Sequence, residues 1–247
     1  MKYLTDEIHE WALGAHSRTN GDYEDIYRAY QLWKHAQELL ISSDHELYRA
    51  DCIANLKRAI NHRLQAIERI YKISKLPLDI SSKRVLDRYE YLGLIRPMVL
   101  NELIKVRNVI EHQDQTPPKK EMCIYYIDIV WYFLKSTDSL VDNIVESIEY
   151  LGDEDNAVIV DVKPGENWIF SAHLRVEKSS LSSEHKAQYL ELSKNVNTDE
   201  DGHVRATVEL KPNARQLITL VNEYFASANF WHEDRFVQQE PTEYQSD

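Results

Sequence analysis

Apolar residues recur at helical spacing through most of the first 150 residues of the chain. Within Asp22–Leu40 they lie three or four positions apart, which predicts an amphipathic helix. A longer apolar stripe runs through Ser43–Ile73 without a glycine or proline, so we expect a second helix there. A shorter helix is expected at Thr5–Ser17.

A third helical region is predicted from Lys83 to His112. The preceding Asp79-Ile80-Ser81-Ser82 offers an N-cap, and Gly93 and Pro97 are expected to bend or divide the region because proline removes a backbone donor. The next segment, Met122–Tyr150, is apolar enough to be the buried centre of a bundle. Helices of these lengths with short connections predict a helical bundle with mostly antiparallel neighbours.

The pattern changes after Gly152. Three segments rich in β-branched and aromatic residues predict strands, at Ala157–Lys163, Asn167–Glu177 and His203–Lys211. The sequence Pro164-Gly165-Glu166-Asn167 suits a hairpin turn between the first two.

Two further helices are expected at Ser182–Lys194 and Pro212–Phe225. We therefore predict a mainly α chain with an all-helical domain at 1–152 and a small α+β domain at 155–228. A polar, loosely ordered tail is expected at 229–247.

Composition narrows the class of protein. The chain has 247 residues, a net charge of −12, six glycines and seven prolines, as in an ordinary globular protein with long helices. No secretory signal or membrane-spanning stretch is evident, and Cys52 and Cys123 are not arranged as a CxxC pair, so we expect a cytoplasmic protein with reduced thiols. Basic residues outnumber acidic ones between Arg49 and Arg107, which suits either a phosphate-binding stripe or a solvated helix face.

One short segment carries candidate chemistry. Arg107 is followed by Asn108 and, five residues after the arginine, by His112, shortly before Thr116-Pro117-Pro118. An arginine, a small polar residue and a nearby histidine at the end of a bundle helix resemble the signature of HEPN domains (higher eukaryotes and prokaryotes nucleotide-binding). The resemblance covers about residues 1–150 and implies an all-helical, dimeric domain, often a metal-independent ribonuclease of toxin–antitoxin or antiviral systems.

These residue types suit metal-free RNA cleavage. A histidine can take the proton of the attacking 2′-hydroxyl, and the planar guanidinium of Arg107 can meet two oxygens of the phosphate. Asn108 lies four residues before His112 and can orient its ring, while Lys105 is a candidate phosphate contact. The resemblance implies products ending in a 2′,3′-cyclic phosphate and a 5′-hydroxyl. We expect neither a metal nor a cofactor.

Helix geometry favours a shared site. Five residues correspond to roughly 140° around a helix axis, so a single helix aims Arg107 and His112 poorly at one phosphate. We therefore expect a homodimer in which the arginine of one chain meets the histidine of the other, with RNA as substrate and an antitoxin or regulatory protein as a possible partner.

The same residues allow a plainer interpretation. Arg107 can pair with Glu111 on the same helix while His112 only favours the negative helix end. The chain would then be a HEPN-like module without catalysis, used for dimerisation or for binding a nucleotide or a protein. The aromatic residues between Tyr125 and Phe133 are interpreted as core or dimer interface.

Overall fold

The structure is a computed structural model that describes residues 6–78, 84–113, 115–152, 156–177, 197–198, 200 and 202–237. The chain divides into two compact units. The helical unit comprises Thr19–Ile144 and Pro164–Trp168. The sheet unit comprises Met1–Arg18, Val145–Lys163 and Ile169–Asp247.

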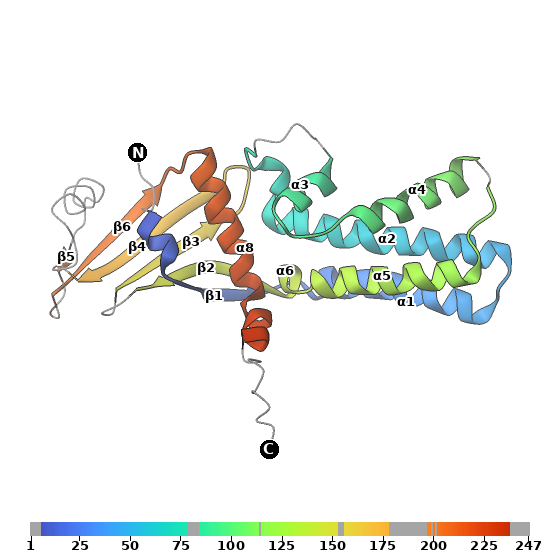
Figure 1. Cartoon of the computed structure of the whole chain (residues 1–247), viewed down its shortest axis with the longest axis horizontal. Helices are drawn as coiled ribbons and strands as arrows, with labels where there is room; N and C mark the ends of the chain where they lie inside the picture. The colour runs from blue at the N-terminus through green and yellow to red at the C-terminus, as the bar shows by residue number, and fades with distance from the viewer. Residues whose placement is uncertain are drawn as a thin grey trace, which may run out of the picture. The chain divides into compact units, whose positions relative to one another are not determined.

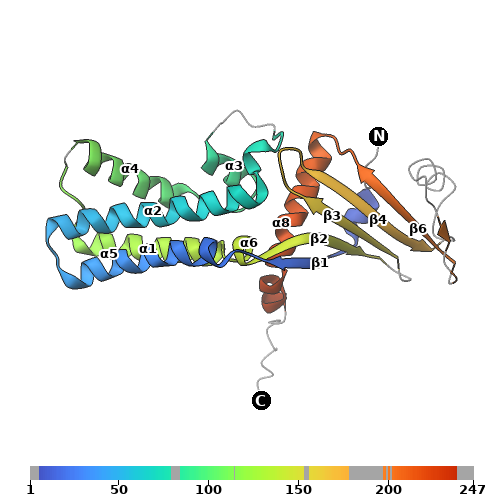
Figure 2. The ribbon, with the colours of Figure 1, turned by 180° about the vertical axis from the view of Figure 1, so that it is seen from behind.

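Long helices α1 and α2 pair in the helical unit, and α5 lies beside both (Figure 1 and Figure 2). The elements are α1 (Tyr23–Ser42), α2 (Glu46–Tyr71), a 3-10 turn η2 (Ile73–Lys75), α3 (Val85–Tyr91), α4 (Met98–Gln113), α5 (Lys120–Ser136) and α6 (Ser139–Asp142). The two helices predicted within Asp22–Leu40 and Ser43–Ile73 are confirmed as α1 and α2.

Local signals set the ends of these helices. The Asp22 carboxylate accepts a hydrogen bond from the Glu24 backbone N–H at 2.8 Å and caps α1. Gly93 has a φ of +69°, which a glycine adopts without a steric cost, and it separates α3 from α4 together with Pro97. The predicted division at these two residues is confirmed. The N-cap expected at 79–82 lies outside the described residues.

The sheet unit is built on a six-stranded sheet in the order β1-β2-β3-β4-β6-β5. The strands are β1 (Ala12–Asn20), β2 (Asn143–Leu151), β3 (Ala157–Lys163), β4 (Ile169–Glu177), β5 (Asn197–Thr198) and β6 (His203–Leu210), with a 3-10 turn η1 (Asp6–Glu10) before β1. The three predicted strands are confirmed as β3, β4 and β6, and β3 and β4 pair as the expected antiparallel hairpin.

One face of the sheet carries the core of its unit. Alternate residues of β3, such as Val158 and Val160, are buried, and helix α8 (Ala214–Val237) lies across this face (Figure 1 and Figure 2). The Tyr224 hydroxyl of α8 donates to the Val145 carbonyl at 2.7 Å. Tyr150 of β2 donates to Glu223 of α8 at 2.7 Å, which anchors the helix at a second point.

The prediction of a mainly α chain is wrong, because the fold is α+β. The segment Thr5–Ser17 was expected to be helical, yet it forms η1 and most of β1. The last part of Met122–Tyr150 was also expected to be helical, yet α5 ends at Ser136 and β2 begins at Asn143. These two unexpected strands are neighbours in the sheet.

The division into domains at 1–152 and 155–228 remains a prediction. The compact units are arranged differently along the chain, because residues from before position 19 and from 145 onward join the same sheet. The helix predicted at 182–194 lies outside the described residues. The last predicted helix is confirmed and is longer than expected, since α8 continues to Val237 into the segment expected to be a loosely ordered tail.

Candidate functional site

Helix α4 carries all four residues of the predicted ribonuclease site. It begins after Pro97, whose carbonyl accepts from the Asn101 N–H at 2.8 Å. Leu100 and Leu103 are buried and define its packed face. Arg107 follows Leu103 by four residues and therefore lies on that same face.

Arg107 is held by its own helix. Its guanidinium forms an ion pair with Glu111 one turn later and donates to the Asn108 side-chain oxygen at 3.2 Å. The side chain is 23% exposed, and its Nε atom is buried without a hydrogen-bond partner among the described residues. The guanidinium is thus pre-positioned, but part of its charge is already balanced by a carboxylate.

The other predicted residues lie on the exposed side of α4. Asn108 and His112 are both exposed, and His112 occupies the last turn of the helix. Within the described part of the chain, no hydrogen bond or ion pair engages His112. Lys105 is exposed and lies 3.5 Å from the Glu102 carboxylate. The structure therefore brings Arg107 together with Asn108 and Glu111, whereas His112 stands outside this group.

Apolar side chains on α5 add an exposed surface to the helical unit. Tyr126 and Phe133 are buried, whereas Tyr125 and Tyr132 are 50% and 67% exposed. A hollow of about 430 Å³ is lined by residues of α5, of α4 and of the segment that leads into α4, among them Leu94, Ile95, Leu100, Ile129 and Tyr132. The aromatic residues thus serve partly as core, as one of the two interpretations predicted. Their use as a dimer interface stays a prediction.

Three clusters in the structure were not predicted from the sequence. Arg63, Asp138 and Tyr30 form a charged network in the helical unit. Cys52 and Cys123, far apart in sequence, are both buried in the core of the same unit, where the nearby Cys123 thiol and burial raise the pKa of the Cys52 thiol. His173 of the sheet unit bonds to Asp161 at 2.9 Å. Each cluster joins residues from separate elements, so no local motif could have revealed it.

No family model, curated protein or solved structure matches the chain. The likeness to HEPN domains accordingly depends on Arg107, Asn108 and His112 and on the helices around them.

Two further features are absent from the part of the chain that the structure describes. No group of three or more histidine, cysteine, aspartate or glutamate side chains there is arranged to hold a metal ion. Among the described helices, none is both long and apolar enough to cross a membrane.

Proposed function

We propose that the chain is a metal-independent endoribonuclease of the HEPN type, in which the 2′-hydroxyl of RNA attacks the adjacent phosphate. The observation that carries this proposal is the exposed end of α4, where His112 and Asn108 face solvent and Arg107 is fixed one turn earlier. His112 would take the 2′-hydroxyl proton, and Arg107 would stabilise the charge that develops on the phosphate oxygens. The products would be a 2′,3′-cyclic phosphate and a 5′-hydroxyl.

The active site would form between two copies of the chain. Arg107 lies on the packed face of α4 and His112 is about 140° away around the helix, so one helix directs them to different sides. A two-fold pairing would let the arginine of one copy meet the histidine of its partner. The exposed Tyr125 and Tyr132 support such pairing, since tyrosines are enriched in interfaces.

The biological setting belongs to the same proposal. A nuclease of this kind would act as a toxin or in antiviral defence, with an antitoxin or regulatory protein restraining it. We place it in the cytoplasm, where Cys52 and Cys123, both free in the structure, would stay reduced.

The ion pair between Arg107 and Glu111 favours a second candidate function. A guanidinium neutralised within its own helix is less able to stabilise a phosphate. The chain would then be a HEPN-like module that dimerises or binds a nucleotide or a protein without cleaving it.

Cleavage of a labelled RNA by the purified full chain in EDTA tests the first proposal. We expect Arg107→Ala and His112→Ala each to lower the cleavage rate by at least about 100-fold, the usual contribution of a general base or a charge-stabilising donor. Matched controls are Arg28→Ala and His35→Ala, because both residues are exposed on α1. End-group analysis should find a cyclic phosphate. A wild-type chain that cleaves no RNA across salt and pH would favour the non-catalytic module.

Co-expression of the two inactive variants tests the shared site. A mixed dimer of Arg107→Ala and His112→Ala chains keeps one intact pair of catalytic side chains. Random pairing should therefore restore about a quarter of the wild-type activity if the site is shared across the two-fold axis. No restoration in a verified mixed dimer would place both side chains of each site in a single copy.

A further inference from the structure

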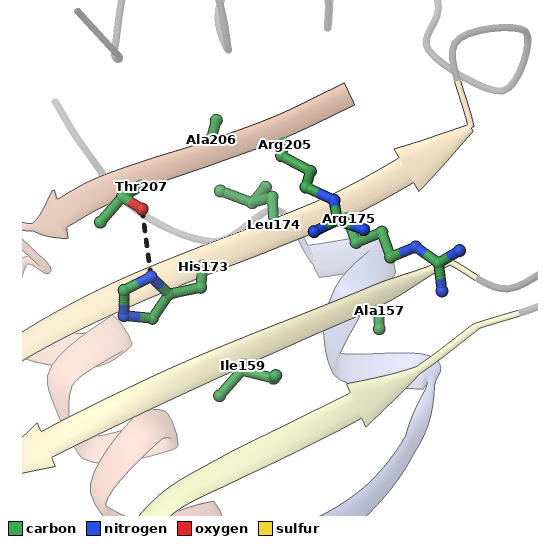
Figure 3. Close-up of a pocket in the computed structure, with 8 residues that line it drawn as sticks. All are labelled: Ala157, Ile159, His173, Leu174, Arg175, Arg205, Ala206 and Thr207. Carbon is green, nitrogen blue, oxygen red and sulfur yellow. Dashed lines mark hydrogen bonds between the residues drawn. The ribbon is translucent and has the colours of Figure 1, made fainter. Parts of the chain in front are cut away.

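Two clusters outside the α4 site contain side chains of the kinds that react or catalyse. One is His173 on the open face of the sheet, where Nδ1 lies 3.1 Å from the Thr207 hydroxyl (Figure 3) and Nε2 lies 2.9 Å from the Asp161 carboxylate. Both ring nitrogens are thus engaged within the protein, which leaves neither for a ligand. The other cluster is the pair of free thiols in the helical unit, Cys52 and Cys123.

These two residues are the only cysteines of the chain, and the packing of two helices brings them to the same level. Helices α2 and α5 lie side by side and run in the same direction (Figure 1 and Figure 2). Arg63 of α2 donates to the Leu134 carbonyl of α5 at 3.1 Å, and these residues are 71 positions apart. Cys52 lies eleven residues before Arg63, and Cys123 lies eleven before Leu134, so the cysteines share the same offset.

The same spacing determines which way the cysteines face. Eleven residues correspond to about three full helical turns, so Cys52 lies on the Arg63 face of α2 and Cys123 on the Leu134 face of α5. All four residues are fully buried. Axes of packed helices are about 8–10 Å apart and each Cα is about 2.3 Å from its axis, so facing Cα atoms can lie within the roughly 4.4–6.8 Å that a disulfide spans.

The two thiols also differ in acidity. The Cys123 thiol, followed by burial, raises the pKa of Cys52. The Cys52 thiol and the positive charge of Arg49 lower the pKa of Cys123, against the opposing effects of burial, Asp44 and Glu121. Arg49 also pairs with Asp44 at 3.0 Å, so only part of its charge acts on the thiol. Cys123 therefore ionises before Cys52 and is the better nucleophile.

We propose that Cys52 and Cys123 form a reversible disulfide between α2 and α5 when the protein meets hydrogen peroxide. The Cys123 thiolate would attack one peroxide oxygen, the O–O bond would break, and hydroxide would leave. The Cys52 sulfur would then attack the sulfur of the resulting sulfenic acid and release a second hydroxide. The two thiol protons convert both hydroxides to water, so two thiols are oxidised while one peroxide is reduced. A thiol reductant would reverse the reaction.

The position of Cys123 gives a small oxidant a route to a buried thiol. Cys123 lies in the first turn of α5, and helix ends open locally at a low cost in free energy. The disulfide would enclose residues 53–122, which include α3 and α4, and would fasten the start of α5 to α2. The reaction does not depend on whether α4 cleaves RNA.

Intact-mass analysis of the full chain tests the disulfide. The reduced chain is treated with hydrogen peroxide, unfolded in the presence of N-ethylmaleimide and weighed. We expect a mass about 2 Da below that of the reduced chain with no maleimide attached, and two maleimides after treatment with dithiothreitol. Cys52→Ser should instead gain oxygen on Cys123, because no second thiol is available to react with the sulfenic acid.

The matched control moves one thiol by two turns along α2. The double variant Cys52→Ala, Ala59→Cys keeps two buried thiols, because Ala59 is also fully buried, but displaces one by about 10 Å along the helix axis. It should form the disulfide at least about ten-fold more slowly than the wild type, because the two sulfurs no longer meet.

Circular dichroism identifies a control that fails to fold, in which case Cys52→Ser carries the comparison. The proposal is overturned if the wild type keeps two reactive thiols or only gains oxygen, if the disulfide joins two copies of the chain, or if the folded control reacts as fast as the wild type.

Discussion

At the scale of single residues, the helical unit contains a fully buried arginine with a single carboxylate partner among the described residues. The Arg63 side chain is fully buried and donates to the Leu134 carbonyl at 3.1 Å, to the Thr137 hydroxyl at 3.2 Å and to the Asp138 carboxylate at 3.0 Å. The Tyr30 hydroxyl donates to the same carboxylate at 2.7 Å. Burial, followed by this hydrogen bond, raises the pKa of Tyr30. Asp138 thus neutralises the charge of the Arg63 guanidinium, which is shielded from water.

Removal of that carboxylate charge should destabilise the helical unit. We expect Asp138→Asn to lower the free energy of unfolding by about 3 kcal/mol, because it leaves Arg63 buried without a counter-ion. The control is Lys135→Met, which removes a half-exposed partner 3.2 Å from the same carboxylate and should cost less than about 1 kcal/mol. Urea unfolding measures both. Equal losses for the two variants would show that Asp138 does not serve as the counter-ion of Arg63.

At the residue scale, the sequence predicts which residues form the candidate site, but it does not predict contacts between residues that are far apart in the chain. The motif predicts that Arg107, Asn108 and His112 share one helix, because they are close in sequence. The Arg107–Glu111 pair is also visible as an i,i+4 spacing. By contrast, the Arg63–Asp138 pair joins residues 75 positions apart, so it depends on how the helices pack and not on any local pattern.

At the scale of elements, the sequence predicts α1, α2 and the division between α3 and α4, but it misses the strands β1, β2 and the short β5. The first two are missed for identifiable reasons. Strand β1 lies at the sheet edge and consists mainly of small and polar residues, none of them buried, so it shows no apolar alternation. Strand β2 begins directly after the single-turn helix α6, and Val145, Ile148 and Tyr150 extend the apolar character of α5 and α6. A change from helical to strand period over so few residues is hard to detect.

Gly21 lies at a junction between two elements where the backbone leaves no room for a side chain. It lies between β1 and α1, and its N–H donates to the Asp142 carbonyl at 2.8 Å. A Cβ at this position would overlap the Val141 carbonyl oxygen, so the two chain segments could not approach as they do.

We expect Gly21→Ala to lower the free energy of unfolding by more than about 2 kcal/mol, as overpacking does when backbone must shift. Gly165→Ala is the control, because its nearest neighbour would be 3.8 Å from the new Cβ. Thermal unfolding of both variants gives the comparison. A Gly21→Ala chain as stable as Gly165→Ala would contradict the close approach.

At the scale of the whole molecule, each unit has a buried tyrosine that must stay neutral. Burial is the main cause of the raised pKa of Tyr89 in the helical unit and of Tyr150 in the sheet unit. In the unfolded chain each would ionise near the ordinary tyrosine pKa of about 10. The stabilisation from a raised pKa is therefore complete below about pH 10 and is lost as the pH rises further.

We expect the urea midpoint to fall as the pH rises from about 9 to about 11, since each buried tyrosine costs roughly 1.4 kcal/mol per pH unit above its unfolded pKa. Tyr89→Phe should make this dependence shallower. The substitution removes only a long hydrogen bond of 3.4 Å to the Leu64 carbonyl, so stability at neutral pH should change little. If the urea midpoint of Tyr89→Phe falls with pH as steeply as that of the wild type, Tyr89 does not cause the pH dependence.

The position of the helical unit within the chain sets an order of events during synthesis. Strands β1 and β2 are neighbours in the sheet, yet residues 19–144 separate the sheet unit's first segment from its second. At about 5–20 residues per second, a ribosome takes on the order of 6–25 s to deliver β2 after β1. Helices form within microseconds. The nascent helical unit thus has time to fold before β2 is available to pair with β1. Ribosome-bound chains halted before β2 should already resist protease across α1 and α2.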